Sequence, residues 1–340
     1  MKLFQRFYLL ILLIVIFLSV LFPSFSFGVD NMRLFRIGTG GQTGVYYPIG
    51  KIIAQGITST NISIEEAGTN ITRVIISTAQ NSGGSLANVQ AITAGEIEAG
   101  LIQADVAAWA FNSKHAFKNN DKVRDIRAIA SLYPEKFQIV TRRDAKINNV
   151  NDLRGKRISV DEVGSGTLAV MRIILETHGL NEKDLKPVYL KPVFTHDKIV
   201  SNELQGFVMM AGAPMEAVTQ LLSTGISLVP IKPEVASMIE SKYPYLVPGL
   251  IPADIYPGIP DTPTIQVHAL LVVNRAMDEE LVYKITAALW NEQTLSILKK
   301  GHPQGKSITT DTALVGISIP LHPGAKKYYQ KHTNRFSSKQ

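Results

Sequence analysis

Four short stretches rich in glycine, serine and threonine are the residues of this sequence best placed to bind a ligand. Each follows an apolar run and precedes a helical pattern; they read GTGGQTGVYYPIG (38–50), QNSGGSLANVQAI (80–92), EVGSGTLAVMRII (162–174) and MMAGAPMEAVTQLL (209–222). The first turn of a helix leaves backbone N–H groups unpaired and carries partial positive charge. Glycine lets a ligand approach that backbone, and serine or threonine adds hydroxyl donors. These turns therefore predict binding of a small anion without lysine or arginine.

Neither common nucleotide-binding signature fits the first stretch. A dinucleotide fingerprint needs G-x-G-x-x-G, and Thr43 stands where the third glycine would be. A P-loop needs serine or threonine directly after its lysine, and Ile52 follows Lys51. The first stretch is therefore not predicted to bind a nucleotide.

The elements that must position these turns alternate between strands and helices along the chain. Strands are expected at about 34–38, 62–66, 73–78, 98–105, 126–144, 156–160, 206–212, 226–231 and 264–274. Helices are expected at about 46–57, 85–94, 167–179, 214–225 and 278–301. This alternation predicts an α/β fold with mostly parallel sheets flanked by helices. Ligands of such sheets lie beyond the carboxyl ends of the strands, where the four turns are expected.

Two β-rich segments are long enough to pass between domains. They lie near 134–140 and near 264–272. Two crossings make one of two domains discontinuous and leave a cleft between two lobes, with two of the four turns on each side.

The N-terminus has the features of a secretory signal peptide. A basic start with Lys2 and Arg6 precedes the apolar core Phe7–Phe22, which Pro23 interrupts. The apolar core is shorter than the roughly 20 residues of a membrane span. Residues 1–28 are therefore expected to be cleaved before Val29; an uncleaved membrane anchor is the alternative. Either way the remainder of the chain is expected outside the cytoplasm.

Composition narrows the possible functions. The chain has no cysteine, which rules out disulfides, thiolate metal sites and cysteine nucleophiles. The formal net charge of +7 includes the two charges of the leader, and no dense basic block with interleaved aromatic residues occurs, so no nucleic-acid partner is expected. The sequence also has no H-E-x-x-H pattern and no histidine pair four residues apart, so no metal and no cofactor is expected.

At these motifs the sequence resembles the TAXI family of solute receptors for TRAP transporters. The resemblance extends from Leu34 to Tyr329. It is carried by several motifs in order: IGTGGQTGVYYPIG, GGSLANVQAITAGEIEAGLIQAD, IASLYPE, DLRGKRISVDEVGSGT, IYPGIPDTPTIQV and PLHPGAKKYY.

This resemblance implies a two-lobe periplasmic binding protein, type II-like, with its ligand cleft between the lobes. Lobe 1 is then residues 29–134 plus 265–340, and lobe 2 is residues 135–264. The implied ligand is a small organic acid, either a dicarboxylate or an amino acid such as 2-oxoglutarate or glutamate. The implied partner is a TRAP permease in the membrane, and the receptor itself is not an enzyme.

The resemblance also implies a set of ligand-binding residues. Asp105 should repel a carboxylate, so it is expected either to accept a hydrogen bond from a ligand amine or hydroxyl or to cap a backbone turn. Tyr46 is expected to stack or to donate through its hydroxyl, or else to pack in the core. The complete set is Thr39, Gly40, Thr43, Gly44, Tyr46, Gly84, Ser85, Gln103, Asp105, Ser165, Gly166, Thr167, Gly212 and Pro214.

Two other functions remain open at this point. Gly83–Ala87 is a near match to the nucleophile elbow of serine hydrolases, which would make Ser85 a nucleophile. A surface immunogenic protein without a ligand is the third possibility.

The sequence also departs from the family in a long segment, 58–80, and in having Gln205 where an aspartate is usual.

Overall fold

The computed structural model describes residues 31–65, 68 and 71–333. The predicted signal peptide, residues 1–28, lies outside the described residues. Within the described part of the chain, no helix combines the length and the apolar character needed to cross a bilayer.

Eleven strands and ten α-helices are described, and strands and helices largely alternate along the chain. The strands are β1 (Met32–Gly38), β2 (Ser63–Glu65), β3 (Thr72–Gln80), β4 (Ala99–Gln103), β5 (Ile126–Arg142), β6 (Arg157–Ser159), β7 (Lys186–Val188), β8 (Gly206–Ala211), β9 (Ile226–Leu228), β10 (Val247–Ile251) and β11 (Thr262–Asn274). The helices are α2 (Tyr46–Ser59), α3 (Ser85–Ala94), α4 (Ala104–Phe111), α5 (Gly166–Thr177), α6 (His196–Val200), α7 (Glu216–Thr219), α8 (Pro233–Lys242), α9 (Glu279–Leu289), α10 (Glu292–Gly301) and α11 (Pro323–Lys331).

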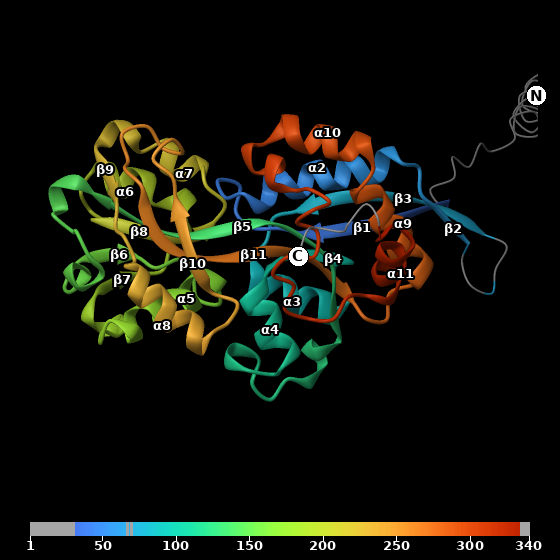
Figure 1. Ribbon diagram of the computed structural model, residues 1–340, viewed down its shortest axis with the longest axis horizontal. Helices are drawn as coiled ribbons and strands as arrows, with labels where there is room; N and C mark the ends of the chain where they lie inside the picture. Colours follow the sequence, from blue (N-terminus) through green and yellow to red (C-terminus); the bar gives the residue numbers. More distant parts are fainter. Residues whose placement is uncertain (1–30, 66–67, 69–70, 334–340) are drawn as a thin grey trace, which may run out of the picture.

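Two lobes share one continuous sheet, and the long strands β5 and β11 run side by side through both of them (Figure 1). The strand order is β2-β3-β1-β4-β11-β5-β8-β6-β7, with β10 on β11 and β9 on β5. The first lobe holds β1–β4, α2–α4 and α9–α11, and the second holds β6–β10 and α5–α8. The predicted two-lobe α/β fold is therefore confirmed.

The sheet is mixed, which corrects the prediction of mostly parallel strands. Parallel pairs join β1 to β3 and β4, and β6 to β7 and β8. Every pairing of β5 and β11 is antiparallel. The difference arises because the two strands that link the lobes pass through the sheet in opposite directions, so the neighbours of each lobe meet them antiparallel.

The antiparallel pair β5–β11 places the two predicted crossings opposite each other. Glu135 pairs with Val267, and Pro134 pairs with His268. The register then shifts between His268 and Leu270, which marks a β-bulge at the junction. The lobe boundaries at 134 and 264 remain a prediction.

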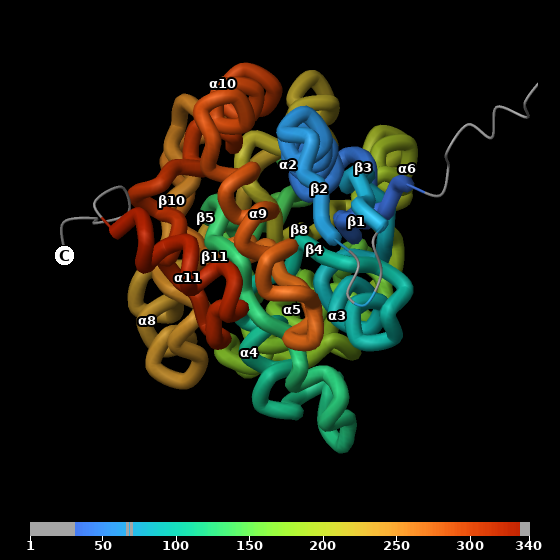
Figure 2. Tube along the Cα trace, turned by 90° about the vertical axis from the view of Figure 1, so that its right-hand side faces the viewer, coloured from blue at the N-terminus to red at the C-terminus, as the bar shows by residue number. Residues whose placement is uncertain are grey.

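The hydrophobic core forms two clusters, one on each side of the sheet. One cluster packs β1 and β5 against α2, α9 and α11, and the other packs β4 and β8 against α3, α4, α5 and α8. Figure 2, turned by 90°, shows α2 and α10 together at the top of the first lobe. Because the sheet is covered on both sides, its central strands are buried and apolar, as the sequence pattern indicated.

Three expected helices are confirmed and two are changed. The helix expected at 214–225 is reduced to the short helix α7. The helices expected at 46–57, 85–94 and 167–179 correspond to α2, α3 and α5. The single helix expected at 278–301 is divided into α9 and α10. The division follows from Asn291, whose side chain accepts a hydrogen bond from the backbone N–H of Thr294 at 2.7 Å and starts a new helix.

Candidate ligand-binding cleft

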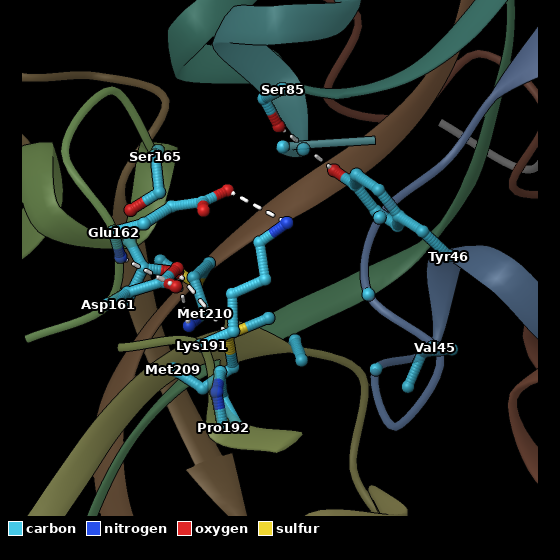
Figure 3. Close-up of a pocket in the computed structure, with 18 of the residues that line it drawn as sticks. Val45, Tyr46, Ser85, Asp161, Glu162, Ser165, Lys191, Pro192, Met209 and Met210 are labelled. Atoms are coloured by element: carbon cyan, nitrogen blue, oxygen red, sulfur yellow. Dashed lines mark hydrogen bonds and ion pairs between the residues drawn. The ribbon is translucent and has the colours of Figure 1, made fainter. Parts of the chain in front are cut away.

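A cavity of about 50 Å³ lies between the lobes and collects the starts of three helices (Figure 3). The turns before α2, α3 and α5 border it, together with the end of β8. This volume is small beside the roughly 300–1,000 Å³ of typical ligand pockets. Its lining residues are Gly40, Gly41, Thr43, Gly44, Val45, Tyr46, Ser82, Gly83, Gly84, Ser85, Gln103, Glu135, Asp161, Glu162, Ser165, Gly166, Thr167, Lys191, Pro192, Val193, Met209, Met210 and Ala211.

A hydrogen-bonded chain of buried side chains, from the first lobe to Glu135 on β5, forms one wall of the cavity. The Tyr46 hydroxyl donates to Glu135 Oε2 at 2.8 Å and lies 3.4 Å from Ser85 Oγ. The backbone N–H of Gln103 donates to Ser85 Oγ at 3.1 Å. Ser85 Oγ can therefore donate its own proton to Tyr46 or to a ligand, and one wall of the cavity ends in a buried carboxyl group.

Burial controls the ionisation of Glu135 and Tyr46 in this wall. Burial raises the pKa of Glu135 well above its usual value, and the charge of nearby Asp105 raises it further, against the hydrogen bond from Tyr46. Burial, followed by the charge of Glu135, raises the pKa of Tyr46 well above its usual value. The Glu135 carboxyl group becomes easier to ionise when a positive charge is placed beside it.

The second-lobe wall of the cavity is formed around the first turn of α5, and the carboxyl group of Asp161 already lies beside that turn. Ser165 caps the helix by accepting from the backbone N–H of Leu168 at 3.1 Å. Asp161, which is 6% exposed, lies beside it and accepts from the backbone N–H of Glu162 at 2.9 Å. Burial raises the pKa of Asp161, while the hydroxyls of Ser165 and Thr167 oppose the rise. This helix start therefore presents a carboxyl group instead of an empty anion site.

Lys191 carries the basic side chain of the cavity. Among the described residues that line it, no other is lysine, arginine or histidine. The Lys191 ammonium lies 3.1 Å from Glu162 Oε1, and Nζ donates to the Ser82 carbonyl oxygen of the opposite lobe at 3.3 Å (Figure 3). Three carboxyl groups and one ammonium thus line the cavity.

Sequence reasoning missed these four charged residues for different reasons. Asp161 directly precedes the third glycine-rich stretch and Glu162 is its first residue, and Glu135 lies inside the long strand β5; all three acids were visible in the sequence. Lys191 follows the short strand β7 in a stretch without glycine, and nothing in its neighbourhood indicates a cleft.

The structure brings most of the predicted ligand-binding residues to this cavity. Ten of the fourteen line it, and their role in binding stays a prediction. They are Gly40, Thr43, Gly44, Tyr46, Gly84, Ser85, Gln103, Ser165, Gly166 and Thr167.

Thr39 and Asp105 lie outside the cavity because both are buried inside the first lobe. The Thr39 hydroxyl donates to the Gln80 carbonyl oxygen at 2.6 Å and so fixes the turn after β1. Asp105 lies in the first turn of α4 with both carboxylate oxygens unpartnered among the described residues. Burial raises the pKa of Asp105 to about 7, against the opposing backbone amides of Val106 and Asp105.

The fourth glycine-rich turn also turns away from the cavity. Gly212 packs so closely on Gln304 that an added Cβ would lie 2.7 Å from Gln304 Cγ. Pro214 follows a cis peptide bond and does not start a helix, since α7 begins only at Glu216 and is four residues long. The end of β8, at Met209–Ala211, lines the cavity in place of this turn.

The surroundings of Ser85 differ from those of a serine nucleophile. A serine hydrolase needs a histidine within hydrogen-bond distance of the hydroxyl. Here the hydrogen-bond partners of Ser85 Oγ are Tyr46 and Gln103, and no histidine lines the cavity in the described part of the chain. The residues described also contain no group of three metal-ligating side chains.

Comparison with known families gives a match over residues 37–332, which is most of the chain. The chain belongs to the NMT1-like family. The family match does not by itself show a TAXI receptor, so membership of the TAXI family stays a prediction.

Solved structures similar to this NMT1-like chain include periplasmic binding proteins. The periplasmic binding protein BugD is 12% identical, with 93% of this chain and 95% of that chain covered, at a TM-score of 0.52. A protein from Bordetella bronchiseptica RB50 is 14% identical over 90% of this chain and 83% of that one, also at 0.52. The periplasmic aliphatic sulphonate binding protein SsuA from Escherichia coli is 14% identical over 88% and 83%, at 0.43. The TM-score of 0.52 to BugD shows that the NMT1-like chain has the fold of that periplasmic binding protein.

Proposed function

We propose that this protein is an extracytoplasmic receptor that captures a small organic acid between its lobes and delivers it to a TRAP permease. The single observation that carries the proposal is the cavity at the junction of the lobes, which is bordered by three helix starts and lined by buried polar side chains. The fold, the family match and the predicted signal peptide are consistent with a receptor exported to the periplasm.

Closure of the lobes is the proposed mechanism. Residues 29–134 plus 265–340 form one lobe and residues 135–264 the other, and they move about the paired segments of β5 and β11. Tyr46 and Ser85 contact the ligand from one side, and Ser165 and Thr167 contact it from the other. Because both sets reach the ligand only in the closed arrangement, binding shifts the population toward closure, and the permease recognises the closed face.

The charges of the cavity favour an amino acid over a dicarboxylate as the ligand. A dicarboxylate such as 2-oxoglutarate would bring two negative charges and no positive one beside Glu162, into a cavity where burial already raises the pKa of Glu135 and Asp161 and so disfavours negative charge. An amino acid such as glutamate adds an ammonium group, which a buried carboxyl group stabilises. We therefore infer that an amino group of the ligand faces Glu135.

Isothermal titration calorimetry with L-glutamate, 2-oxoglutarate and succinate tests this function. We expect L-glutamate to bind with a dissociation constant near micromolar, equivalent to about −8 kcal/mol, and more tightly than the two dicarboxylates. Mass spectrometry of the denatured protein identifies what was bound on purification. Absence of heat with a wide panel of amino and organic acids would favour the surface protein without a ligand.

A further inference from the structure

We propose that Lys191, together with the start of α3, forms the subsite for a carboxylate of the ligand; this inference rests on the proposed function. Lys191 comes from the second lobe, and its stem crosses to the first lobe. Its Cδ atom lies 4.0 Å from the position that a Cβ atom on Gly41 would take. Nζ reaches the Ser82 carbonyl oxygen at 3.3 Å, in the turn that leads directly into α3.

The start of α3 can accept a carboxylate. Its N-cap residue, Gly84, makes no side-chain cap, and its first turn contains no acidic residue. The start of α5 differs, since the Ser165 side chain caps it. An acid of the second lobe lies beside each start: Asp161 at α5, and Glu162 at α3, where its Oε1 is 3.1 Å from the position that a Cβ atom on Gly83 would take. A carboxylate placed at α3 therefore meets unpaired backbone donors and the Ser85 hydroxyl within reach of the Lys191 ammonium.

The present partners of Lys191 can be exchanged for a ligand. The side chains of Lys191 and Glu162 are 28% and 32% exposed, so water reaches their ion pair and its net contribution to stability is small. The other partner, the Ser82 carbonyl oxygen, is a neutral acceptor. A ligand carboxylate at α3 replaces that neutral acceptor with a charged one, and Glu162 competes with it for the same ammonium.

Gln103 provides a second, independent sign that this end of the cavity receives a ligand. Its side-chain Oε1 has no hydrogen-bond partner among the described residues, although Gln103 is only 4% exposed and lines the cavity. A buried amide oxygen without a donor costs free energy, and a ligand ammonium group supplies such a donor. The cavity thus offers a carboxylate position at Lys191 and an ammonium position near Gln103 and Glu135.

The test measures the affinity of wild type and of Lys191→Met for three compounds: L-glutamate, 4-aminobutyrate, which lacks the α-carboxylate, and L-glutamine, which lacks the side-chain carboxylate. For wild type, we expect one of the two analogues to bind about tenfold to hundredfold more weakly than L-glutamate. For Lys191→Met, we expect L-glutamate to be weakened by that same factor and to bind no better than that analogue. Lys191→Arg should keep most of the affinity.

Two further variants test the competition by Glu162 and provide a control outside the cavity. Glu162→Gln removes the competing acid and should strengthen L-glutamate binding by a few fold. Lys198→Met removes a lysine that pairs with Glu203 outside the cavity, and it should leave all three affinities unchanged.

Each outcome decides between the two proposals. If wild type binds L-glutamate but Lys191→Met changes nothing, or weakens all three compounds equally, Lys191 does not contact a carboxylate and the inference is wrong. If wild type binds none of the three compounds, the proposed function for this ligand class is wrong, and the inference is wrong with it.

Discussion

Asp105 is expected to make the stability of this protein fall as the pH rises from 4 to 7. Its side chain is completely buried, and burial raises its pKa to about 7 from an ordinary 3.8. Between these two values the unfolded chain has released the proton and the folded chain still holds it. The folded state therefore binds more protons, and the free energy of unfolding decreases with pH. The contribution of the protonated Asp105 side chain to the free energy of unfolding is complete below pH 3.8 and is lost once the pH has risen through 7.

The size of the effect follows from the two pKa values. At 1.36 kcal/mol for each pH unit, their difference corresponds to about 4 kcal/mol over the whole range. About 2 kcal/mol of this loss falls between pH 5 and pH 7. Asp105→Asn keeps the shape of the side chain and removes its ionisation, so it should remove that part of the pH dependence.

Urea unfolding at half-unit steps between pH 5 and pH 7 measures the effect. The transitions are followed by fluorescence and circular dichroism, because coincident curves justify a two-state treatment. The relevant quantity is the slope of the unfolding free energy against pH, which does not depend on any constant cost of burying the new amide. Asp144→Asn is the control: this residue is exposed, and its hydrogen bond to Arg142 holds its pKa below the usual value, so the slope above pH 5 should not change. An Asp105→Asn protein with the wild-type slope would refute the reasoning, because the carboxyl group would then ionise normally in the folded state.

Three other substitutions test the site and the fold. Ser85→Ala removes the hydroxyl that accepts from the Gln103 backbone N–H, and should weaken L-glutamate binding severalfold in calorimetry with the fold intact; normal affinity would exclude Ser85 from the site. Gly166→Ala places a Cβ atom 2.5 Å from Gln103 Oε1 of the opposite lobe, so it should hinder closure and weaken binding, whereas unchanged affinity would mean that the two lobes do not close on this contact. Asn291→Ala removes the cap of α10 and should lower the unfolding free energy by about 1 kcal/mol in urea, without an effect on ligand affinity.

The sequence predicted the fold class because local patterns specify it. Alternating apolar strands and amphipathic helices, with glycine-rich turns between them, were sufficient to place α2, α3 and α5 and to identify the two long strands that link the lobes. Three of the four turns, those before α2, α3 and α5, border the cavity. Helix ends and turns depend mostly on neighbouring residues, so a single sequence contains the information.

The charged residues of the cleft were not predictable in this way. Lys191 reaches Ser82 across more than a hundred residues of sequence, and Glu135 meets Tyr46 only because β5 passes beside α2. The fourth turn fails for a related reason, since the packing of Gln304 against Gly212 directs that backbone away from the cavity. Each of these outcomes depends on contacts between distant segments.

By itself, the sequence determined the alternation of strands and helices, the two-lobe architecture and the helix starts that face the cleft, because short-range periodicity and turn chemistry decide them. Only the tertiary structure decided which charges meet there. It placed three acids and one lysine around the cavity and left Thr39, Asp105, Gly212 and Pro214 outside it. The physical reason is that burial and pairing of charges depend on how distant segments pack, and the electrostatic character of a binding site follows from that packing.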